Sequence, residues 1–396
     1  MAVLTIIVSL IVLIIIQSIT KNVILAILGA LATIIGFRFD FFSIFSSFYT
    51  PFEEPDLFKL LATVFFIYLF SSGLDESGDA KQFARSTRSL FDERTSMAFM
   101  PMMIGFLPMP GGAMFTAPIV DMIGSGKVSE KSEEEGVSGR YSKDYMMIVN
   151  YWFRHVVEIF WPVYPAFYIM VSLGGIELAP FSISLIPIFF IATVSGWLFL
   201  NGFRLPRIKW PGRHQLKGLW IVLFVLLTGI MILVFNIDGY IALGLNISCY
   251  FLFRRKVFWK SLLRALKKYD VFFLLFLFFV YKNYLTQVNL TMDIANEMEA
   301  FGLNIHLLTL ILPILVGMST GITQSAVGIT APLLLTIGAN PAWMYFAAIA
   351  GVLLSPVHLC VVLTINYYKA SLVKAFAKTL PLLIITGAAV FFLLVL

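Results

Sequence analysis

Residues 107–118 read LPMPGGAMFTAP, with two prolines and two adjacent glycines inside an otherwise apolar stretch. Pro108 and Pro110 end a helix, because proline lacks the backbone N–H that a helix interior needs. The adjacent pair Gly111 and Gly112 permits a tight turn. Lipid cannot satisfy the backbone groups that such a break exposes, so the turn must be shielded by protein or line a wet cavity. We therefore predict that residues 97–124 form two half-length helices that meet at a tip.

A second apolar stretch, residues 305–338, is interrupted in the same way. The interruption is GMSTGITQSAVG (317–328), and TAPLLLTIG (330–338) follows it. This last segment shares five of nine residues with TAPIVDMIG (116–124). Two further blocks align in the same order along the chain, which indicates an internal repeat. These blocks are TVFFIYLF (63–70) with DVFFLLFL (270–277), and WPVY (161–164) with SPVH (355–358).

The rest of the chain is typical of a helical membrane protein. Its 396 residues are 60% hydrophobic and only 13% charged, whereas soluble domains are about 25% charged. Repeated apolar runs of nearly twenty residues predict membrane spans. The two cysteines, Cys249 and Cys360, both fall in apolar runs, and we interpret them as packing residues. Ten spans are predicted, at 2–19, 22–37, 57–74, 145–171, 179–202, 219–237, 240–254, 270–287, 341–366 and 379–396.

Loop charges predict the orientation of these spans. Lysine and arginine concentrate in four loops, which the positive-inside rule places in the cytoplasm. The loops between them are acidic, and the rule is obeyed only if each broken stretch returns to the side it entered from. We therefore predict two re-entrant hairpins, a multi-pass protein of the cell membrane, and both termini outside. The basic loops are 75–95, 203–218, 254–269 and 367–378, and the acidic ones are 50–56, 173–178 and 289–303.

Each half of the chain then contains three spans, a hairpin and two more spans. The number of crossings in each half is odd, so the halves have opposite orientations and form an inverted-topology repeat. The net charge of +6 comes from these topogenic loops and does not indicate nucleic-acid binding. The predicted division is a scaffold part at 1–96, a transport part at 97–202, and the second copies of the two at 203–304 and 305–396.

The two hairpin tips are the predicted binding elements. Half-helix N-termini attract anions, and unwound carbonyl groups can ligate Na⁺. Hydroxyl and amide groups near the second tip suit an oxygen-rich solute or a cation. The alternative is that the breaks only allow close helix packing. The substrate-binding candidates at the tips are Pro110, Gly111, Gly112, Thr116, Ser319, Thr320, Gly321, Thr323, Gln324 and Ser325, with Na⁺ expected near Gly111, Gly112, Ser319 and Thr320.

The span after each hairpin carries its own proline, Pro162 or Pro356. An unwound span facing a hairpin tip would complete a pocket, and Ser355, His358 and Tyr164 would then lie near the membrane midplane. The alternative is a simple bend in each helix.

Charged residues in the span 145–171 are further candidates, because a charge at the bilayer centre costs about 2.5–3.5 kcal/mol on insertion scales. Arg154 and Glu158 stand i and i+4 on one helix face, with His155 beside them. Arg154 is predicted to bind a solute carboxylate, and Glu158, His155 or Asp121 to carry a coupling ion. The alternative is a structural ion pair of Arg154 with Glu158 or Asp121.

With these motifs the chain resembles an uncharacterised family of prokaryotic integral membrane proteins grouped in the ion transporter superfamily. The resemblance covers essentially the whole chain. It rests on LPMPGGAMFTAP, NYWFRHVVEIFWPVYP, STGITQSAVGITAP and SPVH. Distant relatives include the divalent anion/sodium symporters, the gluconate and citrate permeases and a sodium/proton antiporter family. The resemblance implies a scaffold of three spans from each half, a mobile unit with both hairpins, elevator-type motion and a homodimer.

The carboxylate-binding symporters carry Ser-Asn-Thr at each hairpin tip, whereas this chain has PMPGG at one tip and STG followed by TQS at the other. Dicarboxylate specificity therefore does not carry over. We predict a secondary active transporter of a small solute, an organic anion, coupled to Na⁺ or H⁺, with no cofactor other than Na⁺. The alternatives are a cation/proton antiporter that uses Asp121 or Glu158, and a channel or non-transporting assembly protein. An intramembrane enzyme is not expected, because only Ser355 and His358 resemble a nucleophile and its base.

Overall fold

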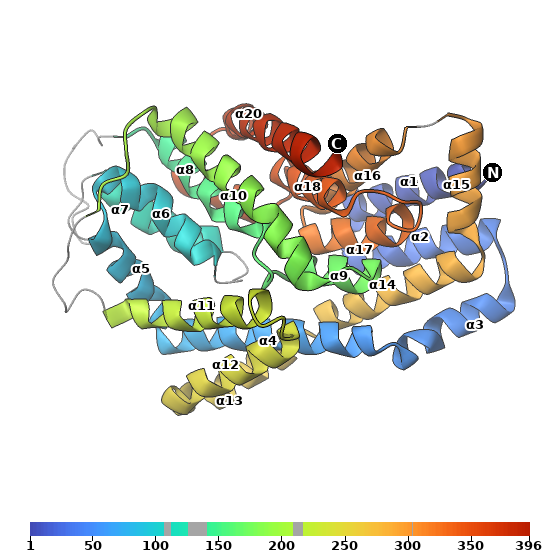
Figure 1. Cartoon of the computed structure of the whole chain (residues 1–396), viewed down its shortest axis with the longest axis horizontal. Coiled ribbons are helices and arrows are strands. Elements are labelled where there is room, and N and C mark those ends of the chain that lie inside the picture. Colours follow the sequence, from blue (N-terminus) through green and yellow to red (C-terminus); the bar gives the residue numbers. More distant parts are fainter. Residues whose placement is uncertain (107–111, 126–140, 209–216, 303) are drawn as a thin grey trace.

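The computed structural model describes residues 1–396 except 107–111, 126–140, 209–216 and 303, and the described residues are helical with no β-strand. Turns and short 3₁₀ segments connect the helices (Figure 1). The first half of the chain contains α1 Ala2–Thr20, α2 Val23–Phe37, α3 Phe41–Tyr49, α4 Pro55–Ser77, α5 Asp79–Leu90, α6 Glu93–Gly105, α7 Gly112–Gly124, α8 Lys143–His155, α9 Pro165–Gly174 and α10 Leu178–Asn201, with 3₁₀ helices η1 Thr50–Glu53 and η2 Val156–Ile159.

The second half repeats this order of helices. Helices α8 and α18 are each 13 residues long, and helices α9 and α19 are each 10 residues long. The helices are α11 Trp220–Leu233, α12 Gly239–Phe253, α13 Phe258–Leu266, α14 Tyr269–Gln287, α15 Leu290–Ala300, α16 Ile305–Thr320, α17 Thr323–Leu334, α18 Pro341–Leu353, α19 Leu359–Tyr368 and α20 Leu372–Val390, with the 3₁₀ helix η4 Arg255–Val257 and the π-helix η5 Phe391–Val395.

Five helices in the described chain are long and apolar enough to cross a membrane: α1, α4, α10, α14 and α20 with its η5 extension. Three more predicted spans correspond to the shorter apolar helices α2, α11 and α12. The remaining two, 145–171 and 341–366, are not continuous helices, in agreement with the unwound spans considered at Pro162 and Pro356. Each is divided near its proline into two helices, α8 and α9 or α18 and α19. The protein is a polytopic α-helical membrane protein, and ten unbroken spans overstate its regularity.

Both stretches with a predicted break are divided in the structure. Residues 97–124 fall into α6 and α7, which pack against each other, and residues 305–338 into α16 and α17, which do the same. Only Gly321 and Ile322 separate α16 from α17. Gly321 has a positive φ of 67°, which glycine adopts without the steric cost of a Cβ atom. The orientation of the two pairs in a membrane stays a prediction.

Helices of each half of the chain pack against helices of the other half. In the first half, α4 packs against α12 and α13 of the second, and α14 of the second half packs against α2 and α3 of the first. The same holds for the broken stretches, where α7 contacts α19 and α17 contacts α9. Figure 1 shows α11, α12 and α13 gathered beside α4 along one edge of the molecule. This exchange brings both broken stretches into one bundle.

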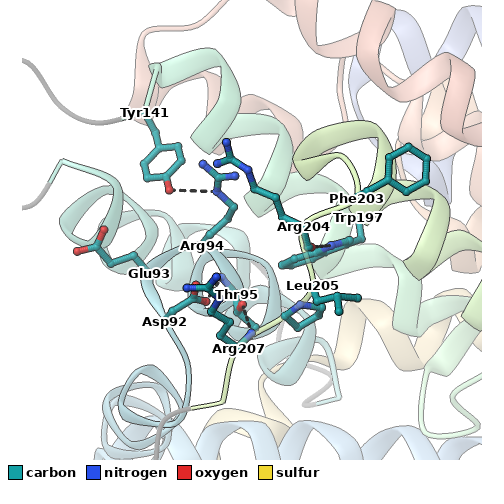
Figure 2. A pocket seen from close by; sticks show the side chains of 11 residues that line it. Asp92, Glu93, Arg94, Thr95, Tyr141, Trp197, Phe203, Arg204, Leu205 and Arg207 are labelled. Atoms are coloured by element: carbon teal, nitrogen blue, oxygen red, sulfur yellow. Dashed lines mark hydrogen bonds between the residues drawn. The ribbon is translucent and has the colours of Figure 1, made fainter.

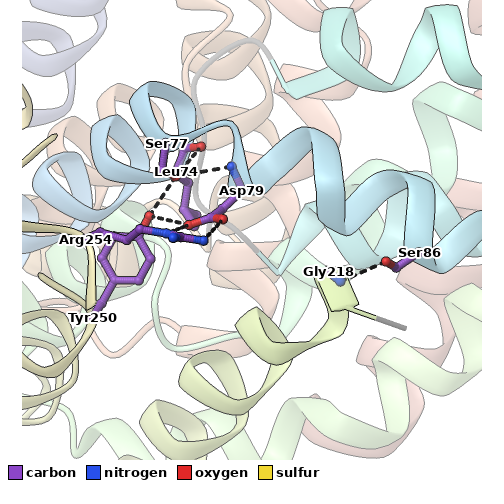
Figure 3. Close-up of polar contacts among 7 residues, drawn as sticks. All are labelled: Leu74, Ser77, Asp79, Ser86, Gly218, Tyr250 and Arg254. Atoms are coloured by element: carbon purple, nitrogen blue, oxygen red, sulfur yellow. Dashed lines mark hydrogen bonds and ion pairs between the residues drawn. The ribbon is translucent and has the colours of Figure 1, made fainter. Parts of the chain in front are cut away.

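A polar junction fastens α5 to α12 at the end of α4 (Figure 3). Asp79, which is 1% exposed, accepts two hydrogen bonds from Arg254, at 2.7 and 2.6 Å, and one from the Tyr250 hydroxyl at 3.0 Å. The hydrogen bonds to Asp79 raise the pKa of the Arg254 guanidinium. Nearby, the backbone N–H of Gly218 donates to Ser86 at 2.9 Å. The buried carboxylate is thus fully engaged by groups from the other half of the chain.

Candidate functional site

A cavity of about 240 Å³ lies where the divided helices of both halves meet the connection between α16 and α17. It combines charged groups, hydroxyls, an amide and two imidazoles in a chain that is otherwise mostly apolar. The lining residues are Ile67, Tyr68, Arg154, His155, Glu158, Tyr164, Pro165, Gly321, Ile322, Thr323, Gln324, His358, Leu359 and Cys360.

The first wall of the cavity is the interruption between α8 and α9. Helix α8 ends at His155, the 3₁₀ turn η2 follows, and α9 begins only at Pro165. Proline is well suited to the first position of a helix, since its missing N–H has no intrahelical partner there. Glu158 lies in η2, with its backbone carbonyl bonded by the Tyr345 hydroxyl at 3.0 Å and its carboxylate near the hydroxyl of Thr323. The interruption therefore exposes an acidic side chain to the cavity.

Arg154 is held against the first broken stretch by a tyrosine. Its Nη1 donates to the Tyr164 hydroxyl at 2.9 Å, and that hydroxyl donates to the backbone carbonyl of Gly105 at the end of α6. Arg154 is 5% exposed. The predicted i, i+4 helical pair with Glu158 is not the geometry found, because α8 ends between the two residues. The two charges share the cavity and act on each other through space.

The second wall is the interruption between α18 and α19, where SPVH forms the unwound segment. The Ser355 hydroxyl donates to the Met318 carbonyl at 2.6 Å, and the carbonyl of Gly321 accepts a hydrogen bond from His358 Nδ1 at 2.8 Å. A Cβ atom on Gly321 would lie 2.8 Å from the His358 backbone nitrogen. Only glycine therefore allows the tip and the unwound segment to come this close.

The other residues that were predicted at the two hairpin tips differ in their surroundings. The hydroxyls of Ser319 and Thr320 both donate to the Val316 carbonyl within their own helix, so neither donates a hydrogen bond to the cavity in this state. Ser325 is fully buried, and its hydroxyl has no hydrogen-bond partner among the described residues. Gly112 begins α7. Pro110 and Gly111 lie outside the described residues, so the first tip and the Na⁺ site predicted there are not described.

Two predicted residues are placed away from the cavity. Thr116 is buried between α7 and α8, where its hydroxyl donates to Asn150. Asp121, near the end of α7, accepts a hydrogen bond from the Tyr367 hydroxyl at 3.4 Å. Neither residue lines the cavity, and Asp121 does not meet Arg154 there.

The sequence analysis missed Cys360, which it interpreted as a packing residue. Cys360 lines the cavity beside His155 and His358. The spacing His-Leu-Cys at 358–360, two residues after Pro356, was a signal for it. Cys360 is the second residue of α19, and its thiol lies close to the imidazole of His358.

A larger cavity, of about 1010 Å³, lies near the start of α6 (Figure 2). Arg94, Arg204 and Arg207 line it, and all three come from loops that the sequence places inside the cell. Arg94 donates to the Tyr141 hydroxyl at 3.2 Å. This cavity shares no lining residue with the smaller one and contains no residue from the second broken stretch, so size alone does not make it the candidate site.

Comparisons with known proteins support the fold. A family model described as "Protein of unknown function (DUF401)" matches residues 1–396. The solved structure of the YdaH transporter of Alcanivorax borkumensis, described as having an unusual topology, is similar to this chain with a TM-score of 0.56. The similarity has 14% sequence identity and covers 90% of this chain and 88% of that one. No curated protein matches this chain in sequence.

Proposed function

Since this chain belongs to the DUF401 family and shares its fold with a transporter, we propose that it is a secondary active transporter of a small organic anion. Transport is coupled to Na⁺ or H⁺ and takes place across the cytoplasmic membrane. The observation that carries the proposal is the cavity in which Arg154, the α16–α17 connection and both interrupted helices meet.

The chemistry of this cavity suits an anion with oxygen atoms. Arg154 supplies a guanidinium, which binds carboxylates in a fixed two-pronged geometry. Thr323 and Gln324 stand at the start of α17, where unpaired backbone N–H groups and the helix dipole favour negative charge. Burial of a guanidinium in a membrane costs free energy, so such a residue is a candidate for a functional role. Binding of an anionic solute is a role that suits Arg154.

An elevator mechanism with inverted repeats is the proposed mode of movement. Two observations support it: the helices α1–α10 and α11–α20 follow the same order, and α7 and α17 each pack on a divided helix of the other half. The bundle around the cavity, residues 97–202 and 305–396, would move as one unit against residues 1–96 and 203–304. Kinship with the ion transporter superfamily and assembly as a homodimer belong to the same proposal.

The test is solute binding followed by flux. Purified protein is screened by thermal unfolding against organic acids, with and without Na⁺ and over a range of pH, and hits are assayed for uptake into proteoliposomes. A hit should raise the unfolding temperature, and its uptake should saturate. Arg154→Ala should abolish both effects while the variant still folds. Solute-independent current, which a channel would give, contradicts the proposal.

A cation/proton antiporter is the second candidate, because Glu158 places a carboxylate in the cavity. An antiporter would change the internal pH of vesicles when Na⁺ is added without any organic solute. The transporter proposed above leaves the internal pH unchanged under those conditions.

A further inference from the structure

Three side chains that are able to bind a metal ion meet in the cavity. They are His155 at the end of α8, and His358 and Cys360 at the second interruption. Their ligating nitrogen and sulfur atoms all lie within 4.8 Å of one another. His155 and Cys360 are buried, at 5% and 8% exposure. The two interruptions of the helices therefore converge on a cluster of nitrogen and sulfur atoms.

Backbone contacts determine which imidazole nitrogens are available. Nδ1 of His155 lies 2.7 Å from the Tyr151 carbonyl oxygen, and Nδ1 of His358 lies 2.8 Å from that of Gly321. A carbonyl oxygen only accepts hydrogen bonds, so each Nδ1 carries a proton and each neutral ring keeps a lone pair on Nε2. The two Nε2 atoms face each other at 3.1 Å. Two lone pairs at this distance repel unless a proton or a metal ion lies between them.

The spacing agrees with a shared metal ion. Two imidazole nitrogens bound to one tetrahedral Zn²⁺, each at about 2.0–2.1 Å, are about 3.3 Å apart. The observed 3.1 Å is close to that separation. A thiolate at about 2.3 Å from the metal would lie about 3.6 Å from each nitrogen, so the Cys360 sulfur needs to move by about 1 Å at most. Imidazoles whose second nitrogen is held by a carbonyl are the arrangement that metal-binding histidines adopt.

We propose that His155, His358 and Cys360 bind a borderline-soft divalent ion, of which Zn²⁺ is the model, through two Nε2 atoms and one thiolate. Na⁺, Mg²⁺ and Ca²⁺ prefer oxygen ligands and do not suit this set. Three protein ligands leave a fourth tetrahedral position open, and it faces the cavity. The inference adds a metal ion to the cavity and does not require that the protein transports a solute.

Charge balance indicates what occupies the fourth position. The metal ion and Arg154 bring three positive charges, and the Cys360 thiolate and Glu158 bring two negative ones. One excess positive charge remains in a buried site, and a singly charged oxyanion such as a carboxylate would neutralise it. The ion and the guanidinium would then hold the same anion from two sides.

The test measures metal binding directly on the purified full-length protein, without vesicles. Co²⁺ is the probe, added after treatment with a chelator, because a thiolate bound to Co²⁺ gives a charge-transfer band in the near ultraviolet. One equivalent of Co²⁺ should produce this band, and Zn²⁺ should displace it. Cys360→Ser should remove the band, and His155→Gln or His358→Gln should weaken binding at least about tenfold.

The chain offers matched controls for both kinds of ligand. Cys249 is exposed on α12, and His306 lies at the start of α16, outside the cluster. Cys249→Ser and His306→Gln should therefore keep the band at full height. Absence of the band in the unmodified protein, or its survival in Cys360→Ser, overturns the proposal. If Cys360→Ser does not fold, the two glutamine variants decide, and unchanged Co²⁺ affinity in both overturns it equally.

Discussion

The carbonyl oxygen of Gly321, at the connection between α16 and α17, accepts a hydrogen bond from Nδ1 of His358 at 2.8 Å. This contact joins the second broken stretch to the second interrupted helix across 37 residues of sequence. It requires a glycine, because φ is +67° and a Cβ atom would lie 2.8 Å from the His358 nitrogen. The tip and the unwound segment thus form one wall of the cavity.

Gly321→Ala should lower the unfolding temperature and abolish solute uptake, because the added methyl group pushes the tip away from His358. The left-handed conformation itself costs an alanine about 1–2 kcal/mol. Gly338→Ala is the control, since Gly338 also has a positive φ but open space around its Cα. Gly338→Ala should lose only the stability that the left-handed conformation costs, Gly321→Ala should lose more, and only Gly321→Ala should lose uptake. Equal uptake in both would argue against a role for the tip.

Tyr164→Phe should weaken solute binding by releasing Arg154. The Tyr164 hydroxyl joins Arg154 to the Gly105 carbonyl, and loss of a buried hydrogen-bond partner costs about 1–3 kcal/mol. Tyr368→Phe is the control, since the buried Tyr368 hydroxyl bonds the Ala117 carbonyl at 2.8 Å away from the cavity. Thermal unfolding should show similar losses for both variants. The solute-induced stabilisation should shrink only in Tyr164→Phe, and shrinkage in both would contradict this role.

Asp79→Asn should destabilise the protein by at least about 2 kcal/mol, because Asp79 is buried and its hydrogen bonds to the charged Arg254 are each of the stronger kind. Arg254 is partly exposed, which limits the loss. Asp75→Asn is the control. Its pair with Arg264 is exposed on both sides and is worth about 0–1 kcal/mol. Equal thermal shifts for the two variants would mean that the junction between α5 and α12 contributes little.

Sided cysteine labelling tests whether the second hairpin returns to the side it entered from. Glu299→Cys and Thr336→Cys, made in a Cys249→Ser background, flank α16 and α17 and are exposed. Both should react with an impermeant reagent from outside the cell. Lys267→Cys, in a basic loop, should react only from inside. Labelling of residue 336 from the same side as residue 267 would mean that the stretch crosses the membrane.

Much of the fold could be predicted from sequence, because proline and glycine act locally. The breaks in 97–124 and 305–338 were predicted from clustered helix-breaking residues, and both stretches are divided in the structure, although single prolines such as Pro118 and Pro313 lie inside helices. Hydropathy identifies the spans 145–171 and 341–366 but does not show where each of them unwinds. Pro162 and Pro356 indicated a bend, but the length of each unwound segment depends on contacts such as Ser355 with the Met318 carbonyl.

The site was less predictable, since it depends on where helices end. Arg154 and Glu158 were paired on the assumption of a continuous helix, and the end of α8 at His155 separates them. Asp121, in the second arm of the first predicted hairpin, was considered as a partner for Arg154, yet it accepts a hydrogen bond from Tyr367. Cys360 lies close to His358 along the chain, but His155 joins these two residues only through the packing of one half of the chain on the other, which no local pattern in the sequence records.

Helix α7 packs on α19 and α17 packs on α9, so each half of the chain depends on contacts from the other half. This predicts how a chain that contains only one half would behave. Such a chain would keep the packing of its hairpin on its own interrupted helix, but each of them would lack the helix of the other half that covers it. Only two copies lying head to tail could supply the missing contacts. Fragments 1–202 and 203–396 made as separate polypeptides should therefore be degraded when produced alone and should recover a folded protein when produced together.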